Sequence, residues 1–370
     1  MASKVYFTDM RTKPDRNIFK KLDEVMNRAG IDTIDFKDKF TAVKLSFGEP
    51  GNIAYLRPNF VAAIVKKIKD LGGRPFLTDA NTLYYGKRSN AVDHLETAML
   101  HGFNRMMVGC DVMIADGLTG LDAVEIPINL KHVQNAKIGS LIHAAEILIS
   151  VTHFKGHIGT GIGGALKNVG MGCGSRKGKL EMHSSSKPKM KQENCVACGV
   201  CIKNCPENAI AYNKDHKAEI DYSKCIGCGQ CVASCHYGAA VVVWDEAESV
   251  MCEKMAEYAY AVLKDKPHFH ISFMLNITPD CDCFHSNDQA IAPDVGIAAS
   301  FDPVALDRAC VDLVNQAPFI PNSSLTDKGS YAVGEDKFQH IHPATHWQDC
   351  LDHAQEIGLG SQEYTLVKIA

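Results

Sequence analysis

The 370-residue chain contains no run of about 18 uncharged apolar residues, which is the length that a helix needs to cross a bilayer. The best candidate, residues 136–151, is interrupted by Lys137, His143 and Glu146. The N-terminal stretch MASKVYFTDMRTKPDRN also lacks the apolar core of a secretion signal. We therefore expect a cytoplasmic protein with no membrane partner.

The chain also has little excess charge of either sign. It carries 39 Lys and Arg against 43 Asp and Glu, a net charge of −4, and no long basic run. Nucleic-acid-binding domains usually carry a basic patch, so no nucleic acid partner is expected. The apolar content of 46% and the charged content of 22% are those of an ordinary globular protein, and the length allows two or three domains.

Cysteine, in contrast, is abundant, with fifteen residues. Disulfides are not expected in a chain without signs of secretion. Eight of the cysteines fall in two arrays, NCVACGVCIKNCPENAI at 194–210 and KCIGCGQCVASCHYGAA at 224–240. The spacing C-x2-C-x2-C-x3-C is that of bacterial ferredoxins with two clusters, whereas structural zinc sites use two C-x2-C pairs.

In such ferredoxins the fourth cysteine of each array binds the cluster of the other array. The arrays therefore predict two [4Fe–4S] clusters that together form an electron relay. Cluster 1 is expected on Cys195, Cys198, Cys201 and Cys235, and cluster 2 on Cys225, Cys228, Cys231 and Cys205.

Apolar runs and helical patterns alternate on both sides of the arrays. Strands are expected at 4–9, 40–48, 74–81, 111–117, 268–275 and 294–300, and helices at 17–30, 57–73, 90–103, 251–265 and 302–316. This alternation indicates an α/β fold with a mostly parallel sheet flanked by helices. We expect an α/β domain at 1–185 and 247–370, with an α+β ferredoxin-like module inserted at 186–246.

The stretch VTHFKGHIGTGIGGALKNVGMGCG, residues 151–174, follows a strand and is rich in glycine. His153 and His157 could bind a metal or move protons, and Lys167 could hold an anion with the amides at a helix start, near Gly161 and Gly164. We take His153, His157 and Lys167 as catalytic candidates. The alternative is a tight turn with surface histidines. His183 is a weaker third histidine.

Two further strand ends carry polar residues. Residues 43–58 and 77–86 each combine a strand with a glycine-containing loop. Side chains in these loops could line a polar pocket, or could form a solvated rim and helix caps. The candidates for substrate or anion binding in the first loop are Lys44, Asn52 and Arg57, beside Glu49. The second loop carries Asp79 and Asn81, for which helix capping is the alternative.

A third polar loop contains the motif CDC. Cys281 and Cys283 could offer two thiolates, or a thiolate and the Asp282 carboxylate, to an additional metal ion. The alternative is that both are buried free cysteines, which are common in protein cores. The acidic surroundings of the loop favour a functional role.

Four ordered segments, VKLSFGEPGN, THFKGHIGTGIGGALKNVGMG, CDCF and PDVGIAASFDPVALDRACVDLVNQ, resemble the DUF362 family of uncharacterised Fe–S centre proteins. The resemblance implies an α/β domain with a 2[4Fe–4S] insert, and it implies no settled reaction. The run from His157 through GTGIGGALK is also similar to one in lactate-racemase-like proteins, which bind a nickel-pincer nucleotide. Ile162 stands where that run has serine.

These features favour an iron–sulfur oxidoreductase or electron-transfer protein whose clusters serve a site at the strand-end loops. Its partner is then an electron donor or acceptor, either a protein or a small molecule, and a homo-oligomer is compatible with the sequence. One rival is a pure electron carrier that docks a protein partner. The other is a non-redox metal enzyme in which the clusters are structural.

Replacing Cys205 with serine tests the crossed pairing. Although Cys205 lies in the first array, its loss should damage cluster 2 more than cluster 1, because its thiolate is predicted to bind cluster 2. EPR spectra of the reduced variant should retain the signal of cluster 1. Selective loss of cluster 1 would contradict the pairing.

Overall fold

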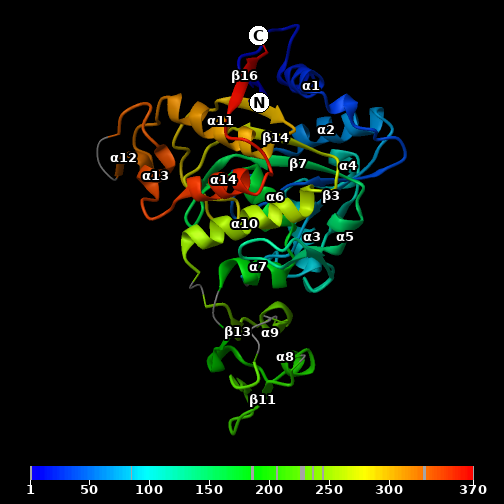
Figure 1. Ribbon diagram of the computed structural model, residues 1–370, viewed down its shortest axis with the longest axis vertical. Coiled ribbons are helices and arrows are strands. Elements are labelled where there is room, and N and C mark those ends of the chain that lie inside the picture. The colour runs from blue at the N-terminus through cyan, green and yellow to red at the C-terminus, as the bar shows by residue number, and fades with distance from the viewer. Residues whose placement is uncertain are drawn as a thin grey trace.

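The computed structural model describes residues 2–84, 86–184, 187–205, 207–225, 230–235, 237–243, 246–327 and 331–369 (Figure 1). Its main sheet has the strand order β16-β1-β15-β14-β7-β2-β3-β4. β15 is antiparallel to both of its neighbours, and the other adjacent strands are parallel. The strands are β1 Ser3–Asp9, β2 Phe40–Lys44, β3 Arg74–Asp79, β4 Val112–Ile114, β7 Ile147–His153, β14 His268–Met274, β15 Gly296–Ser300 and β16 Tyr364–Lys368.

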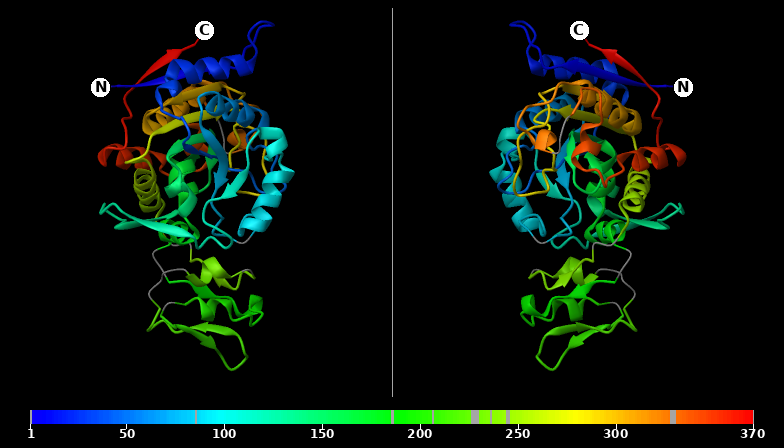
Figure 2. Two further views of the ribbon diagram at one scale, coloured as in Figure 1. Left: turned by 90° about the vertical axis from the view of Figure 1, so that its right-hand side faces the viewer. Right: turned by 90° about the vertical axis from the view of Figure 1, so that its left-hand side faces the viewer.

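Helices cover both faces of this sheet, which confirms the predicted α/β fold class (Figures 1 and 2). Alternate side chains of a strand point to opposite faces, so that Ala42 belongs to one apolar core and Val43 to the other. One core contains α6 Ala165–Cys173, α10 Glu248–Leu263, α11 Pro303–Gln316 and α14 Trp347–Glu356. The other contains α1 Ile18–Ala29, α2 Pro58–Asp70, α3 Ala91–Leu100 and α4 Arg105–Val108.

The helix ends follow the expected chemistry. Gly30 ends α1 in the left-handed conformation, with φ at 90°, which glycine adopts without steric cost. Pro58 begins α2, and the Asp302 side chain caps α11 ahead of Pro303. These local signals explain why the sequence identified the main helices.

The smaller elements were less evident in the sequence. The hairpin at 123–139 and the last strand of the sheet were not predicted. Each of these strands has five residues, and several of those residues are exposed or half-buried. The smaller elements are β5 Ala123–Pro127, β6 Asn135–Gly139, α5 Ser140–Ala144, β8 Lys155–His157, β9 Gly161–Gly163, α7 Arg176–His183, β10 Lys189–Met190, α8 Val200–Lys203, β11 Ile210–Tyr212, β12 Ala218–Ile220, α9 Gln230–Ser234, β13 Ala240–Val241, α12 Ser324–Asp327 and α13 Lys337–Ile341. Short 3-10 helices lie at Ile31–Thr33 and Gln192–Asn194.

The cysteine-rich segment lies at one end of the molecule, beyond α7, and the two chain termini lie at the opposite end (Figure 1). β7 precedes this segment and β14 follows it, yet the two strands pair directly, with His153 beside Phe273. One sheet is therefore built from chain on both sides of the segment. This pairing fixes the loops after β7 and β14 beside each other.

Replacing Asp302 with alanine should lower the free energy of unfolding by about 1–2 kcal/mol, because the α11 cap is lost. Its carboxylate also accepts hydrogen bonds from the Ser3 hydroxyl at 2.7 Å and the Ser361 amide at 2.9 Å, which join both ends of the chain to α11. Denaturant titration of the reduced protein should show this loss. Asn17→Ala is the control, because it removes only the cap of α1 at the surface and should lower the free energy of unfolding by less. An equal decrease in both variants would contradict the additional tertiary role of Asp302.

Candidate functional site

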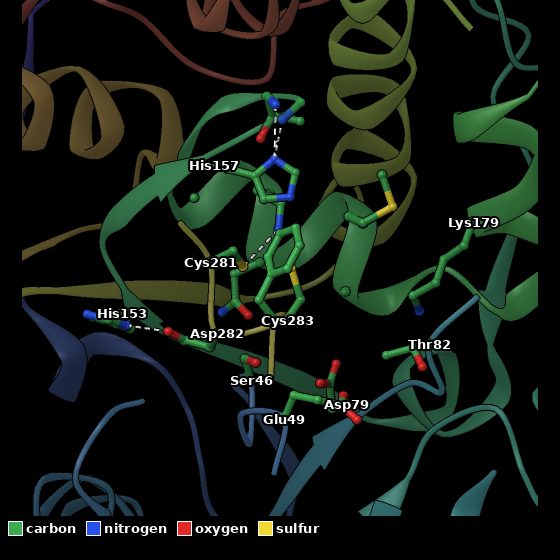
Figure 3. A pocket seen from close by; sticks show the side chains of 18 of the residues that line it. Ser46, Glu49, Asp79, Thr82, His153, His157, Lys179, Cys281, Asp282 and Cys283 are labelled. Carbon is green, nitrogen blue, oxygen red and sulfur yellow. Dashed lines mark hydrogen bonds and ion pairs between the residues drawn. The ribbon is translucent and has the colours of Figure 1, made fainter. Parts of the chain in front are cut away.

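A cavity of about 770 Å³ lies at the carboxyl ends of β2, β3, β7 and β14 (Figure 3). Loops at this edge of a parallel sheet commonly form ligand sites. All four predicted strand-end loops contribute, and α6 and α7 complete the wall. The polar and charged residues of the wall include Lys44, Glu49, Asp79, Thr82, Arg88, His153, Lys155, His157, Lys167, Lys179, His183, Cys281, Asp282 and Cys283.

His153 and Asp282 join β7 to the CDC loop. His153 Nδ1 lies 2.8 Å from Asp282 Oδ1, and its Nε2 lies 2.8 Å from the carbonyl oxygen of Leu275. Asp282 Oδ2 lies 3.4 Å from Lys155 Nζ. Burial alone would raise the pKa of Asp282, but the charges of His153 and Lys155 outweigh it and hold that pKa below its usual range. Both nitrogens of His153 face oxygen, so His153 positions the loop.

The additional metal set expected from the sequence was Cys281, Asp282 and Cys283, but the structure groups different side chains. Asp282 is drawn away from the cysteines by its ion pairs (Figure 3). His157 takes its place, because its ring and the two cysteine sulfurs offer ligand atoms that all lie within 4.8 Å of one another. We call these three residues the triad, and they could hold a metal ion that accepts thiolate and imidazole ligands.

Gly156 explains how His157 reaches the cysteines. β8 runs beside the loop after β14, and the Gly156 amide donates to the carbonyl of Thr278 at 2.9 Å. A Cβ at position 156 would stand 2.0 Å from the carbonyl oxygen of Pro279. Only glycine permits this approach, so the motif KGH places Lys155 and His157 on either side of a close backbone contact.

The two cysteines of the triad have different charge states. A hydrogen bond from Cys283, together with the nearby Lys167, holds the pKa of Cys281 well below its ordinary value. The same bond and burial raise the pKa of Cys283. Lys167 Nζ lies 3.4 Å from Cys281 Sγ, and this thiolate outweighs burial and raises the pKa of Lys167. Cys281 is therefore the thiolate and Cys283 its thiol partner.

His157 is a neutral hydrogen-bond donor in this arrangement. Burial and the charge of Lys167 hold its pKa well below its ordinary value. Its Nδ1 accepts hydrogen bonds from the amides of Gly159 at 3.1 Å and Thr160 at 3.0 Å. A neutral imidazole carries one proton, so that proton resides on Nε2.

The helix start near Gly164, expected to bind an anion, is already occupied by a side chain of this chain. The carboxylate of Asp307 accepts from the amides of Ala165 at 2.6 Å and Leu166 at 2.9 Å. Burial raises the pKa of Asp307 to about 7. Gly161, with φ at 71°, packs against Thr345 and Trp347 rather than lining the cavity. Asp307 lies far along the chain, so local sequence could not reveal that it occupies this site.

The other anion candidates separate into one cavity residue and two that lie elsewhere. Lys44 lines the cavity and pairs with Asp79 at 3.0 Å. Asn52 donates to the carbonyls of Phe284 and Ser286, so it braces the CDC loop. Arg57 is exposed and precedes α2.

Sequence reasoning missed two cations in the cavity wall. Arg88 is buried and pairs with Glu49 at 2.7 Å. Lys179, on α7, points toward Thr82 in Figure 3 and donates to the carbonyl of Gly174. Burial lowers the pKa of Lys179 to about 8, and within the described ranges no ion pair joins it to a carboxylate. Arg88 lies in a turn and Lys179 in a helix, and a charged residue in either setting gives no sequence signal that its side chain points inward.

Four of the array cysteines line one small cavity: Cys195, Cys198, Cys201 and Cys235. The amides of Ala218 and Ala239 donate to the sulfurs of Cys195 and Cys235, each at 3.3 Å. The cysteines predicted for cluster 2 that the structure describes belong to a single apolar cluster that also contains three of these four, and they are Cys205, Cys225 and Cys231. Cys228 lies outside the described residues.

The cavity and the cysteine-rich segment share part of their packing. Leu83 lines the cavity and also belongs to the apolar cluster that contains Cys195, Cys201 and Cys231. The Arg176 guanidinium donates to the carbonyl of Leu83 at 3.2 Å and to that of Val232, in α9, at 3.0 Å. The cavity wall is therefore in direct contact with the segment that carries the arrays.

A family model described as "Domain of unknown function (DUF362)" matches residues 41–312, most of the chain. The chain belongs to the DUF362 family. No match was found among curated proteins. None of the described helices is long and apolar enough to span a membrane.

Two solved structures share a broad likeness. The lactate racemase apoprotein from Thermoanaerobacterium thermosaccharolyticum is 13% identical with a TM-score of 0.45, over 84% of this chain and 58% of that one. A Thermotoga maritima protein is 10% identical with a TM-score of 0.41, over 81% of this chain and 59% of that one. The chain thus spans less than two thirds of either protein, and neither informs its chemistry.

Replacing Lys167 with methionine should raise the pKa of Cys281, because the cation that stabilises the thiolate is removed. In the wild type, alkylation of Cys281 by iodoacetamide in EDTA should stay fast at lower pH than that of an ordinary thiol, because Lys167 stabilises the thiolate. In the variant the rate should fall about tenfold for each pH unit below the new pKa. Peptide mass spectrometry resolves this site from the other cysteines.

Lys179→Met is the matched control for Lys167→Met. It removes a buried cation from the same cavity without touching Cys281, so its alkylation rate should follow the wild type. An equal slowing in both variants would show a general effect on the cavity and not the specific Lys167–Cys281 contact.

Proposed function

We propose that this protein is an iron–sulfur oxidoreductase in which two [4Fe–4S] clusters exchange electrons with the cavity of the α/β domain. The observation that carries this proposal is the shared packing at Leu83, which lines the cavity and belongs to the apolar cluster around the array cysteines. An electron carrier in contact with a reactive cavity has an acceptor or donor close by.

The arrangement of the arrays supports the clusters. The four cysteines around one small cavity are those predicted for cluster 1, and they come from both arrays, as crossed ligation requires. The amide N–H groups directed at Cys195, Cys205 and Cys235 resemble the hydrogen bonds that stabilise cluster sulfurs. We also propose that this module spans residues 186–246.

The cavity supports a reaction on a small molecule. Volumes of this size suit small-molecule ligands, and Lys44, Arg88 and Lys179 place buried positive charge in the wall. Cys281, Lys167 and His157 provide a thiolate, an ammonium and a neutral N–H donor. The exposed Cys198 array loop offers an external protein or small molecule access to cluster 1. We place this chemistry in the reducing cytoplasm, where thiolates persist.

Anaerobically prepared protein should contain about eight iron and eight sulfide per chain, because two [4Fe–4S] clusters are proposed. Reduction should produce EPR signals of two interacting clusters, and oxidised protein should absorb broadly in the visible range. Two zinc ions per chain without acid-labile sulfide would overturn the proposal.

One observation favours a second function, that of a metal-dependent enzyme. The triad of His157, Cys281 and Cys283 could hold one metal ion with an open coordination position. Zinc titration of chelated protein should then show a site of strong affinity that Cys281→Ser abolishes. In that case the clusters would be structural, and chemistry would continue after they were bleached.

A further inference from the structure

We propose that Cys281 and Cys283 are a redox couple that alternates between a dithiol and a disulfide, and that the dithiol reduces a small organic disulfide bound in the cavity. This inference deepens the proposed function and rests on it for the supply of electrons. It assigns the substrate a class, which the proposed function leaves open.

The geometry of the CDC loop suits an intramolecular disulfide. The Phe284 amide donates to the Cys281 carbonyl at 3.0 Å and closes a turn around the motif. Asp282 is held on the far side by His153 and Lys155, and the two cysteine sulfurs lie within 4.8 Å of each other. Both sulfurs also line the cavity, so a substrate could reach them (Figure 3).

The position of the proton on His157 favours a pair of cysteine thiols over a metal site. A metal takes the lone pair of an imidazole nitrogen, and the other nitrogen then carries the proton. Here the Nδ1 lone pair accepts two backbone amides, from Gly159 and Thr160, and the proton is on Nε2. The Nε2–H group can donate a hydrogen bond to a sulfur, but it has no lone pair for a metal.

The oxidative half of the cycle is a thiol–disulfide exchange. The Cys281 thiolate attacks one sulfur of the substrate, forms a mixed disulfide and releases a thiolate. Cys283 then loses its proton to that released thiolate and attacks Cys281. The products are the Cys281–Cys283 disulfide, one free thiol and one free thiolate, so that the substrate gains two electrons and one proton.

The reductive half restores the dithiol. The disulfide takes two electrons, one from each reduced cluster, and one proton, while its S–S bond breaks. The products are the Cys281 thiolate beside Lys167 and the Cys283 thiol. That proton comes from solvent, and the Nε2–H group of the neutral His157 can donate a hydrogen bond to the sulfur that becomes the thiolate. The two halves sum to the transfer of two electrons from the clusters to the substrate.

The first experiment asks whether the couple exists. Anaerobic full-length protein, chelated to remove adventitious metal, is treated with bis(2-hydroxyethyl) disulfide and then with iodoacetamide, and digested for mass spectrometry. The peptide that contains both cysteines should appear 2 Da lighter and unalkylated. In Cys283→Ser the probe should instead remain attached to Cys281 as a mixed disulfide.

Cys173→Ser is the control, since this cysteine is buried in α6 outside the triad, and it should behave as the wild type. If the wild type forms no 281–283 disulfide and the Cys283→Ser variant carries no adduct on Cys281, the couple does not exist. That result would leave the iron and sulfide content, and thus the proposed clusters, unaffected.

The second experiment tests the electron supply. Protein is oxidised with the same probe, its clusters are then reduced with dithionite, and the excess is removed at once. The wild type should recover the dithiol while its cluster EPR signals disappear, with two electrons used per disulfide. In Cys205→Ser, where cluster 2 is expected to be damaged, recovery should fall at least several-fold. A stable disulfide beside two reduced clusters would overturn electron delivery, although the couple itself would stand.

Discussion

The contact between His153 and Asp282 is the interaction on which the site depends. It joins the end of β7 to the loop after β14, two segments separated by the whole cysteine-rich region. Because Asp282 is held toward His153 and Lys155, the cysteines on either side of it point into the cavity. A buried carboxylate without such partners would be protonated or would move to solvent, and the turn would lose its orientation.

The sequence predicts the parts of this molecule that depend on local rules. Alternating apolar runs revealed the main strands, and Gly30, Pro58 and Asp302 marked helix ends, because each acts through its own backbone or the next turn. The antiparallel direction of β15 and the place of β16 beside β1 depend on pairing between distant strands. No local pattern encodes those pairings.

The candidate site likewise combines features that the sequence predicts with features that it does not. The chemical types were recognisable, since His157, Lys167 and the two cysteines of the CDC motif all line one cavity. Their partners were not: Asp282 turns away from the cysteines it separates, and the carboxylate at the start of α6 comes from Asp307 in a later helix. The inward direction of Lys179 likewise depends on how α7 packs. The sequence shows which residue types are present, whereas the direction of each side chain depends on the fold.

The buried charges in the wall of the cavity indicate that it is a reactive site. Removing paired ions from water usually contributes little net stability, yet this cavity gathers the pairs Lys44–Asp79, Arg88–Glu49 and Lys155–Asp282. Concentrations of buried charge and shifted pKa values are typical of reactive sites.

The number of electrons that the proposed reaction needs also fits a pair of clusters. Each cluster carries one electron, whereas cleaving one S–S bond requires two. The two proposed clusters would together supply the two electrons that the proposed Cys281–Cys283 disulfide accepts, and the Lys167 cation would offset the negative charge left on Cys281.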